Sequence, residues 1–224
     1  SRTGRQSFLN FGFNYHKSRN FDQILSASSR LTNASQNKLT YQKLREGLLY
    51  ELDDNGLPRE DRAMITHNQL DNIYYKSLMK DADGNFGYYD ASGYTFNKAM
   101  RGYIGEYDLN ISGNLNDQVY LGLTVGIHDV HYKGYSEYTE TLMPNRDNIS
   151  NLTVVDNREI TGTGYDLKVG AIFRPVEDSP FRIGVSVATP TWYDLTTSIY
   201  TYITDGNISF FFSDTATTEI YTPW

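Results

Sequence analysis

The sequence predicts an all-β fold with a helical insertion. Five segments alternate apolar and polar residues with the period of two that is typical of strands with one apolar face. These segments are Phe8–Lys17, Gly102–Gly113, Val119–Ile127, 162–175 and Phe181–Thr189. The short polar stretches 114–118 and 175–180 separate consecutive segments and have the composition of tight turns. We therefore expect antiparallel strands joined by hairpins.

An insertion at about 18–100 separates the first strand from the second. Leu39–Leu52 has apolar residues at helical spacing and is followed by the turn sequence Asp-Asp-Asn-Gly. Asp61–Met79 has the same spacing and is followed by Asp-Ala-Asp-Gly. Both segments are predicted to be helices. A second long connection, rich in Tyr and Asn, lies between Ile127 and Thr161, so both long connections fall at the strand ends opposite the short turns.

Composition excludes several classes of protein. No run approaches the roughly 18 apolar residues of a membrane-spanning helix, and the mean hydropathy is −0.54. The chain has no cysteine, which excludes disulfide frameworks and thiolate metal sites. The formal charge of −7 and the lack of a basic cluster argue against nucleic acid as a partner. Strand-spanning membrane proteins remain possible, because alternation dilutes their apolar residues.

The motifs that resemble catalytic or metal sites are each incomplete. His128 and His131 are three residues apart, so in a strand they point to opposite faces and do not share an ion; we expect ordinary histidines at the edge of a loop. Gly-Val-Ser-Val-Ala at 184–188 lacks the last glycine of a nucleophile elbow. The stretch at 81–85 lacks the glycine and the glutamate of a calcium loop. We expect no enzyme activity, no cofactor and no metal.

The apolar face of these strands could meet either the core of a soluble sheet or lipid. Tyr165 and Phe173 bracket the apolar residues of 162–175, as in the aromatic girdles of outer-membrane barrels. Each apolar segment has about the nine to eleven residues of a tilted spanning strand. The polar face mixes glycines with charged residues, which fits a barrel interior as well as a solvated surface. Its charged residues are Glu106, Asp108, Asp166, Lys168 and Arg182. Together with the unequal loops, these features favour a partial antiparallel outer-membrane β-barrel.

Three stretches strengthen this reading by resemblance. GTGYDLKVGAIFRPVEDSPFRIGVSVATPTWYDL (162–195) resembles paired strands of the FadL-type outer-membrane transporters. NISGNLNDQVYLGLTVGI (110–127) resembles another hairpin of that family, and 8–21 resembles an early strand. The family's N-terminal plug, which contains Asn-Pro-Ala, should lie upstream.

The resemblance implies transport of hydrophobic small molecules, such as long-chain fatty acids, across the outer membrane of a Gram-negative bacterium. Outer-membrane lipid would then surround the chain, and we expect a monomer when the protein is full length. The inserted helices would form an external apolar groove, or their apolar residues would simply pack the helices together. The candidate lining residues are Leu44, Leu48, Ile65, Ile73 and Tyr74. The competing function is a soluble or surface-anchored β-rich module that binds carbohydrate.

The ends of the chain give two further expectations. The run FFFSDTATTEIYT after residue 209 resembles translated sequencing-adapter DNA, so we expect 209–224 to be a non-native tail and 1–208 to be the native part. No signal peptide opens the chain, and we expect it to be truncated at both ends. Five strands are fewer than the eight of the smallest bacterial barrels. We therefore expect an open, curved sheet with helices beyond one rim.

Overall fold

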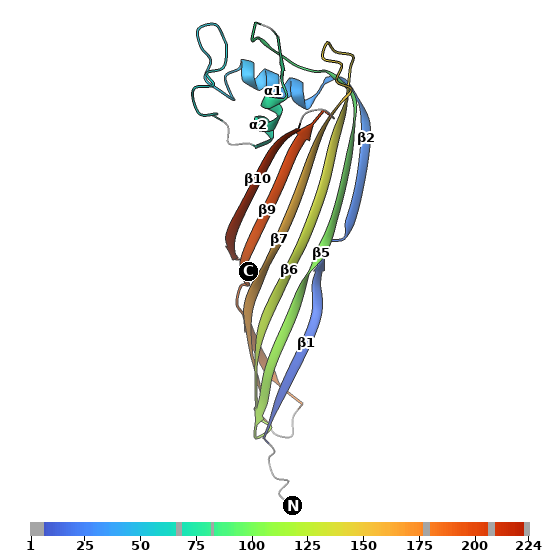
Figure 1. The fold of residues 1–224 in the computed structure, drawn as a ribbon. Helices are drawn as coiled ribbons and strands as arrows, with labels where there is room; N and C mark the ends of the chain where they lie inside the picture. Colours follow the sequence, from blue (N-terminus) through green and yellow to red (C-terminus); the bar gives the residue numbers. More distant parts are fainter. Residues whose placement is uncertain (1–6, 66–68, 82, 177–179, 206–208, 222–224) are drawn as a thin grey trace, which may run out of the picture.

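The computed structural model describes residues 7–65, 69–81, 83–176, 180–205 and 209–221 as one long antiparallel sheet with two helices beyond one end (Figure 1). The sheet has eight strands in the order β1-β5-β6-β7-β9-β10, with β2 beside β5 and β8 beside β7. Within the described residues the two ends of this order do not pair with each other, so the sheet is open. The predicted all-β fold with a helical insertion is confirmed at this level.

The elements have the following bounds. The first edge consists of β1 (Phe8–Asn20) and β2 (Gln23–Ala34), and the centre of β5 (Ala91–Leu115), β6 (Val119–Leu142) and β7 (Asn151–Phe173). The other edge consists of β8 (Ile183–Ala188), β9 (Trp192–Thr204) and β10 (Ser209–Tyr221). The insertion holds α1 (Gln36–Arg45), α2 (Gln69–Lys76) and the small pair β3 (Met79–Lys80) and β4 (Phe86–Gly87). Neither helix in this described part of the chain is long and apolar enough to cross a membrane.

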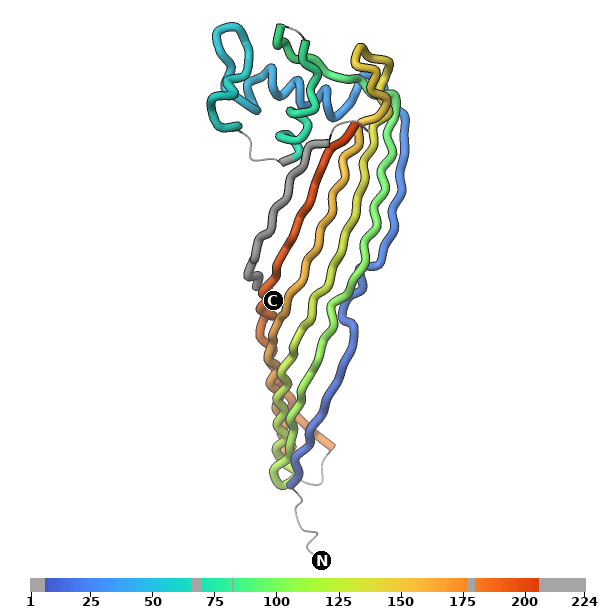
Figure 2. Tube along the Cα trace, in the orientation of Figure 1, coloured from blue at the N-terminus to red at the C-terminus, as the bar shows by residue number. Residues whose placement is uncertain are grey.

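Two shorter strands follow each other along each edge of the central three. β1 pairs with the half of β5 nearest the 114–118 turn, and β2 pairs with its other half, as the blue segments of Figure 2 show. The bend between them lies opposite Gly102, whose φ is +134° and whose added Cβ would lie 2.0 Å from the carbonyl oxygen of His131. Gly102 therefore permits a close approach that another residue would prevent. β8 and β9 follow each other along β7 in the same way.

The five predicted strands are present, but three of them are much longer than predicted. β5, β6 and β7 have 25, 24 and 23 residues, roughly 80 Å at about 3.3 Å per residue. The predicted long connection between Ile127 and Thr161 is wrong, because most of it is strand and only 143–150 connects β6 to β7. These strand extensions lack clean alternation, and backbone pairing continues without it.

The structure describes the first of the two predicted turns in full and the second only in part. Asn116 and Asp117 both have positive φ, 54° and 55°, and the Gln118 N–H donates to the Leu115 carbonyl at 3.1 Å, which confirms a tight turn at 114–118. Of the second predicted turn, 177–179 lie outside the described residues. β7 ends and β8 begins on either side of it.

The helical insertion is shorter than predicted. Because β1 continues to Asn20, β2 follows it and β5 begins at Ala91, the part without long strands is 35–90 rather than 18–100. The first helix begins after Ser35, whose Oγ accepts from the Lys38 N–H at 2.9 Å, and is followed by Gly47 in the left-handed region. The second helix is confined to Gln69–Lys76. Both predicted helices exist, but the first begins and ends earlier than predicted, at Gln36–Arg45, and the second lies within its predicted bounds.

The segment after residue 209, predicted to be a non-native tail, forms β10. Its backbone pairs with β9 from Ser209 opposite Thr204 to Tyr221 opposite Trp192. Backbone pairing is possible for many sequences, so the origin of this segment stays a prediction.

The two faces of the sheet differ most in the half that ends at the Asn116–Gln118 turn, which we call the turn half. We call the face that carries Val169 the outer face and the face that carries His128 the inner face. The strand register aligns apolar residues in rows across the outer face. One row holds Phe11, Ile111, Leu123, Val169 and Val187, and the next towards the helices holds Phe13, Leu109, Val125 and Leu167.

Exposure in the turn half is the reverse of that in a water-soluble sheet. On the outer face Phe11 is 74% exposed, Val185 65% and Val169 48%. On the inner face Glu106 is 8% exposed and His128 and Asp166 are 5% exposed. Soluble proteins rarely leave so large an apolar surface uncovered, and they seldom bury charged groups. Within the described residues nothing covers the outer face of the turn half.

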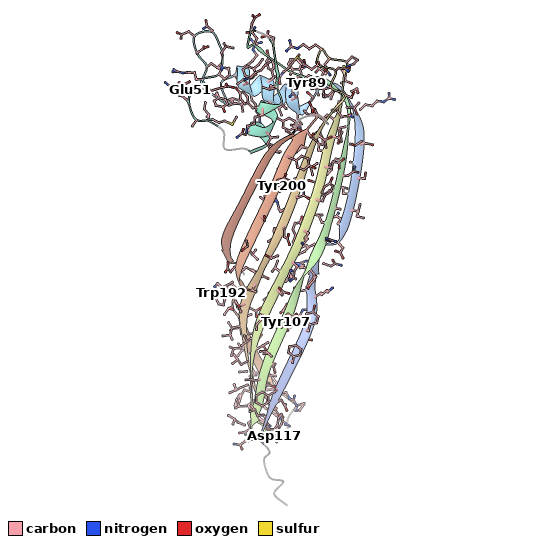
Figure 3. All side chains as sticks on the ribbon, viewed as in Figure 1. Glu51, Tyr89, Tyr107, Asp117, Trp192 and Tyr200 are labelled. Carbon is pink, nitrogen blue, oxygen red and sulfur yellow. The ribbon has the colours of Figure 1, made fainter. Side chains whose placement is uncertain are left out.

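We call the apolar outer face of the turn half the apolar band. A row of mostly aromatic residues lies at the end of this band that is nearer the helices. The row holds Tyr15, Tyr107, Ile127, Tyr165 and Trp192. The rings of Tyr15 and Tyr107 lie 4.8 Å apart. Figure 3 labels Tyr107 and Trp192, which lie near the middle of the long sheet. Aromatic residues at this position are typical of the boundary between hydrocarbon and water.

Beyond the aromatic row, in the helix half, the outer face becomes polar and the inner face carries both apolar and polar residues. On β6 the outer face continues with Asp129, His131 and Lys133, whereas the inner face carries Val130 and Tyr132. The inner face ends in a buried cluster beneath the helices. This cluster contains Ile73, Tyr74, Tyr89, Ala91, Leu142, Leu152, Val154 and Ile203. The same strands thus have an apolar outer face in the turn half, and in the helix half a mixed inner face that ends in this buried cluster.

Candidate functional site

A cavity of about 590 Å³ lies between the helices and the inner face of the helix half. Its volume is within the roughly 300–1,000 Å³ of small-molecule sites. The helical insertion contributes Gln36, Leu70 and Tyr74, and the sheet contributes Phe96, Ser136, Tyr138, Val154, Asp156, Arg158, Ile199 and Thr201. The sheet residues alternate along β5, β6, β7 and β9, so period-two geometry directs all of them to the same side. The cavity therefore combines apolar side chains with a larger number of hydrogen-bonding and charged ones.

Arg158 supplies positive charge to this cavity. It lies on β7, two residues from Asp156, whose Oδ1 accepts a hydrogen bond from Thr201 Oγ1 at 2.7 Å. In the described part of the chain the Arg158 side chain has no hydrogen-bond or ion-pair partner. A guanidinium group carries its charge at every physiological pH and binds carboxylates through paired N–H donors. The cavity can thus hold an apolar molecule that has an anionic group.

Glu140 fastens α1 over the cavity. Its Oε1 accepts from the Gln36 N–H at 2.8 Å and from the Tyr138 hydroxyl at 2.9 Å. The residue is 1% exposed, and its Oε2 has no hydrogen-bond partner in the described residues. Burial raises the pKa of Glu140, while the two hydrogen bonds oppose that rise. Burial also raises the pKa of Tyr138, so its hydroxyl remains a neutral donor.

The second helix is held against the first helix and the sheet. Lys43 Nζ lies 2.8 Å from Asp71 Oδ1 and joins α1 to α2. Tyr74 is 5% exposed, and burial raises its pKa far above the usual range. The Asn37 side chain accepts from the Tyr89 N–H at 2.9 Å and donates to the Ser77 carbonyl at 3.3 Å. These contacts fix the wall of the cavity that the insertion provides.

The five predicted groove residues lie in different surroundings, and one of them, Tyr74, lines the cavity. Leu44 is buried with Leu49, Tyr75 and Leu78, in the packing between the helices and their neighbours. Ile73 belongs to the cluster on the inner face of the sheet. Leu48 and Ile65 are 53% and 50% exposed. The structure therefore does not bring the five together in one groove, and binding by them remains a prediction.

Sequence reasoning missed the sheet wall of the cavity. Phe96, Tyr138 and Arg158 lie in stretches that the sequence analysis treated as insertion or connection. A usable signal was present in β7, where Val154, Asp156 and Arg158 occupy alternate positions. That alternation mixes apolar and charged residues on one face, and for this reason it does not register as a strand pattern.

The two histidines set aside by the sequence analysis lie within β6 rather than at the edge of a loop, so that part of the prediction is wrong. They do point to opposite faces, as predicted. His131 Nε2 lies 2.9 Å from Asp129 Oδ2 on the outer face. His128 Nε2 lies 2.5 Å from Asp166 Oδ2 on the inner face.

Comparisons with known proteins add no identification. No protein-family model matches the chain, and neither a curated protein nor a solved structure shows significant similarity to it.

Proposed function

We propose that this chain is part of an outer-membrane transporter of a Gram-negative bacterium that carries hydrophobic small molecules such as long-chain fatty acids. The observation that carries the proposal is the change of the outer face from apolar to charged along the strands. In the turn half the outer face is apolar and exposed, and in the helix half the outer face carries Asp129, His131 and Lys133. A strand that leaves hydrocarbon and enters water requires this change, whereas a strand in a soluble sheet does not.

The dimensions of the apolar band agree with a bilayer. On β5 the band runs from Tyr107 to Leu115, which is nine residues. A tilted strand crosses the hydrocarbon layer in about 9–11 residues. The long strands then extend beyond the aromatic row, and the helices lie at their far end. In this arrangement the cavity lies on the same side of the bilayer as the helical insertion.

The cavity supports the choice of an amphipathic cargo. Leu70, Phe96 and Ile199 provide apolar surface, and Arg158 provides a charge for a carboxylate. The lining also offers hydrogen-bonding side chains that a carbohydrate could use, including Gln36, Ser136 and Asp156, but the charge of Arg158 favours an anionic cargo over a neutral carbohydrate. The uncovered outer face also argues against a soluble carbohydrate-binding module, because such a module would bury that face.

A binding experiment in lipid nanodiscs tests the proposed cargo. We expect the chain to bind oleate, and to bind it more tightly than oleyl alcohol, because only oleate pairs with Arg158. Arg158→Ala should weaken oleate binding by about tenfold or more, which is the value of one charged hydrogen bond. Arg101→Ala is the matched control, since Arg101 lies on the outer face opposite Lys133 and does not line the cavity.

Three outcomes would contradict the proposal. The first is equal binding of oleate and oleyl alcohol, and the second is an equal loss in both arginine variants. The third is binding of a maltooligosaccharide with displacement of oleate, which would favour the carbohydrate-binding alternative.

A further inference from the structure

A second group of chemically reactive side chains lies on the inner face of the turn half, outside the cavity described above. Glu106 on β5, His128 on β6 and Asp166 on β7 come together there. One nitrogen of His128 and one carboxylate oxygen of each acid lie within 4.8 Å of one another. All three residues are buried. Three different strands thus deliver three metal-ligating side chains to one place.

Glycine makes room for this arrangement. Asp166 lies opposite Gly126 in the register, and a Cβ added to Gly126 would lie 2.6 Å from Asp166 Oδ2. With glycine there, the Asp166 carboxylate lies over β6 and reaches His128 Nε2 at 2.5 Å. Gly164, opposite His128, likewise has the Tyr193 ring 2.6 Å from its added Cβ. A larger residue at either position would displace the cluster.

Two buried atoms of the cluster are available to a ligand. His128 Nδ1 and Asp166 Oδ1 have no hydrogen-bond partner in the described residues, although both side chains are more than nine-tenths buried. His128 Nδ1 lies 4.0 Å from Glu106 Oε2. Two ligand atoms of a tetrahedral Zn²⁺ ion are about 3.3–3.6 Å apart, given bonds of about 2.0–2.2 Å. A small side-chain movement would therefore bring His128 Nδ1 and Glu106 Oε2 to the separation of two ligand atoms.

Asp166 also orients the imidazole ring for such a role. When His128 Nε2 carries the proton it donates to Asp166 Oδ2, and Nδ1 is then left with its lone pair free. Metal-binding histidines usually have a carboxylate or carbonyl on their second nitrogen in this way.

The charge of the cluster favours a dication. Lys168 Nζ lies 2.9 Å from Glu106 Oε1, 3.4 Å from Asp108 Oδ1 and 3.7 Å from Asp166 Oδ1. Three carboxylates thus share a single ammonium group, and His16 Nε2 lies 3.4 Å from Glu106 Oε2, so two negative charges are uncompensated when both His16 and His128 are neutral. Buried charge without compensation is costly. Lys168 lowers this cost only in part, and a divalent ion would neutralise the remainder.

We propose that His128, through Nδ1, and Glu106 bind a divalent transition-metal ion of the Zn²⁺ type, with Asp166 orienting the imidazole ring through its contact with Nε2. Imidazole together with carboxylate suits Zn²⁺, whereas Mg²⁺ and Ca²⁺ prefer oxygen ligands alone. The site would link β5, β6 and β7 on the inner face. It does not depend on the proposed transport function, because the cavity and the cluster share no residue.

Calorimetric titration of the 224-residue chain with Zn²⁺ in detergent micelles tests the proposal. We expect one tight site that excess Mg²⁺ does not displace, and X-ray absorption should show a nitrogen and oxygen shell that includes an imidazole. His128→Gln and Asp166→Asn should each weaken Zn²⁺ binding by about tenfold or more. His131→Gln is the matched control, because His131 lies on the same strand but on the outer face beside Asp129.

A further variant keeps Glu106, His128 and Asp166 in place. Lys168→Met removes the ammonium that competes with the ion, so it should tighten Zn²⁺ binding by about threefold or more. The proposal is overturned if the unaltered chain binds Zn²⁺ no more tightly than His128→Gln. It is also overturned if His131→Gln loses as much affinity, or if Lys168→Met leaves affinity unchanged or weaker.

Discussion

A charge on the outer face should be costly in the middle of the apolar band and nearly harmless beyond the aromatic row. Val169 lies four residues from Tyr165 and four from Phe173, the aromatic residues that bracket the band on β7. At about 3.3 Å per residue this bracket is about 26 Å long along the strand. If the strand is tilted by about 40°, the projection of this length on the bilayer normal is about 20 Å. Val169 is therefore close to the bilayer midplane.

Val169→Arg should lower the free energy of unfolding in lipid by about 2–4 kcal/mol, the cost of arginine at the midplane of a membrane barrel. Thr163→Arg lies on the same face of β7 but beyond Tyr165, where the cost falls to about 0–1 kcal/mol. Gly170→Ser is a second control on the inner face, since its added Cβ has no neighbour closer than 3.8 Å.

The assay is denaturant unfolding in phospholipid vesicles followed by tryptophan fluorescence. The chain has 2 tryptophans, so Trp224→Phe leaves Trp192, in the aromatic row, as the single reporter. Equal losses for Val169→Arg and Thr163→Arg would refute the depth assigned to the band. A loss below about 0.5 kcal/mol for Val169→Arg is the value expected of a water-exposed surface, and would refute contact with lipid.

Two further predictions concern the helix end. Burial raises the folded-state pKa of Glu140 above its ordinary 4.5, so protonation of Glu140 favours the folded state. This stabilisation is complete below about pH 4.5 and is lost as the pH rises through the raised pKa. Thermal melting should therefore show a lower midpoint at about pH 7 than at about pH 4, and Glu140→Gln should reduce that difference; an equal pH dependence in both proteins would contradict the assignment. The second prediction uses the absence of cysteine from the chain: in the full-length protein on intact cells, Met143→Cys should react with an impermeant maleimide and Asn116→Cys should not. The reverse labelling pattern would invert the proposed orientation.

The sequence predicted the sheet best where one face is apolar. Val119–Ile127 alternates cleanly because its outer face carries Leu121, Leu123 and Val125, and that stretch is the turn half of β6. The continuation of β6 to Leu142 was missed. Beyond the aromatic row, tyrosines, serines and charged residues occupy both faces, so hydrophobic periodicity disappears while backbone pairing continues.

To predict the cavity and the charged cluster from the sequence, one needs the register of the strands, and only part of the sequence specifies that register. Once the Asn116–Gln118 turn pairs Leu115 with Val119, counting back along both strands places Glu106 opposite His128. Asp166 could not be placed in the same way, because the connection between β6 and β7 was predicted to be more than four times its actual length. The sequence also could not show that Arg158 and the helices line the same cavity, because nothing in the sequence of the helices specifies which part of the sheet they cover.

The central claim is that β7 has a lipid-facing side that ends at the aromatic row. Cysteines placed one at a time from 157 to 173 and labelled with nitroxide would measure it in vesicles, through collision with oxygen from the lipid and with a water-soluble nickel chelate. We expect oxygen accessibility at the odd positions from Tyr165 to Phe173, low values at the even positions between them, and nickel accessibility at Thr163 and Thr161. Uniform nickel accessibility along the strand, or oxygen accessibility at the even positions instead, would contradict the account.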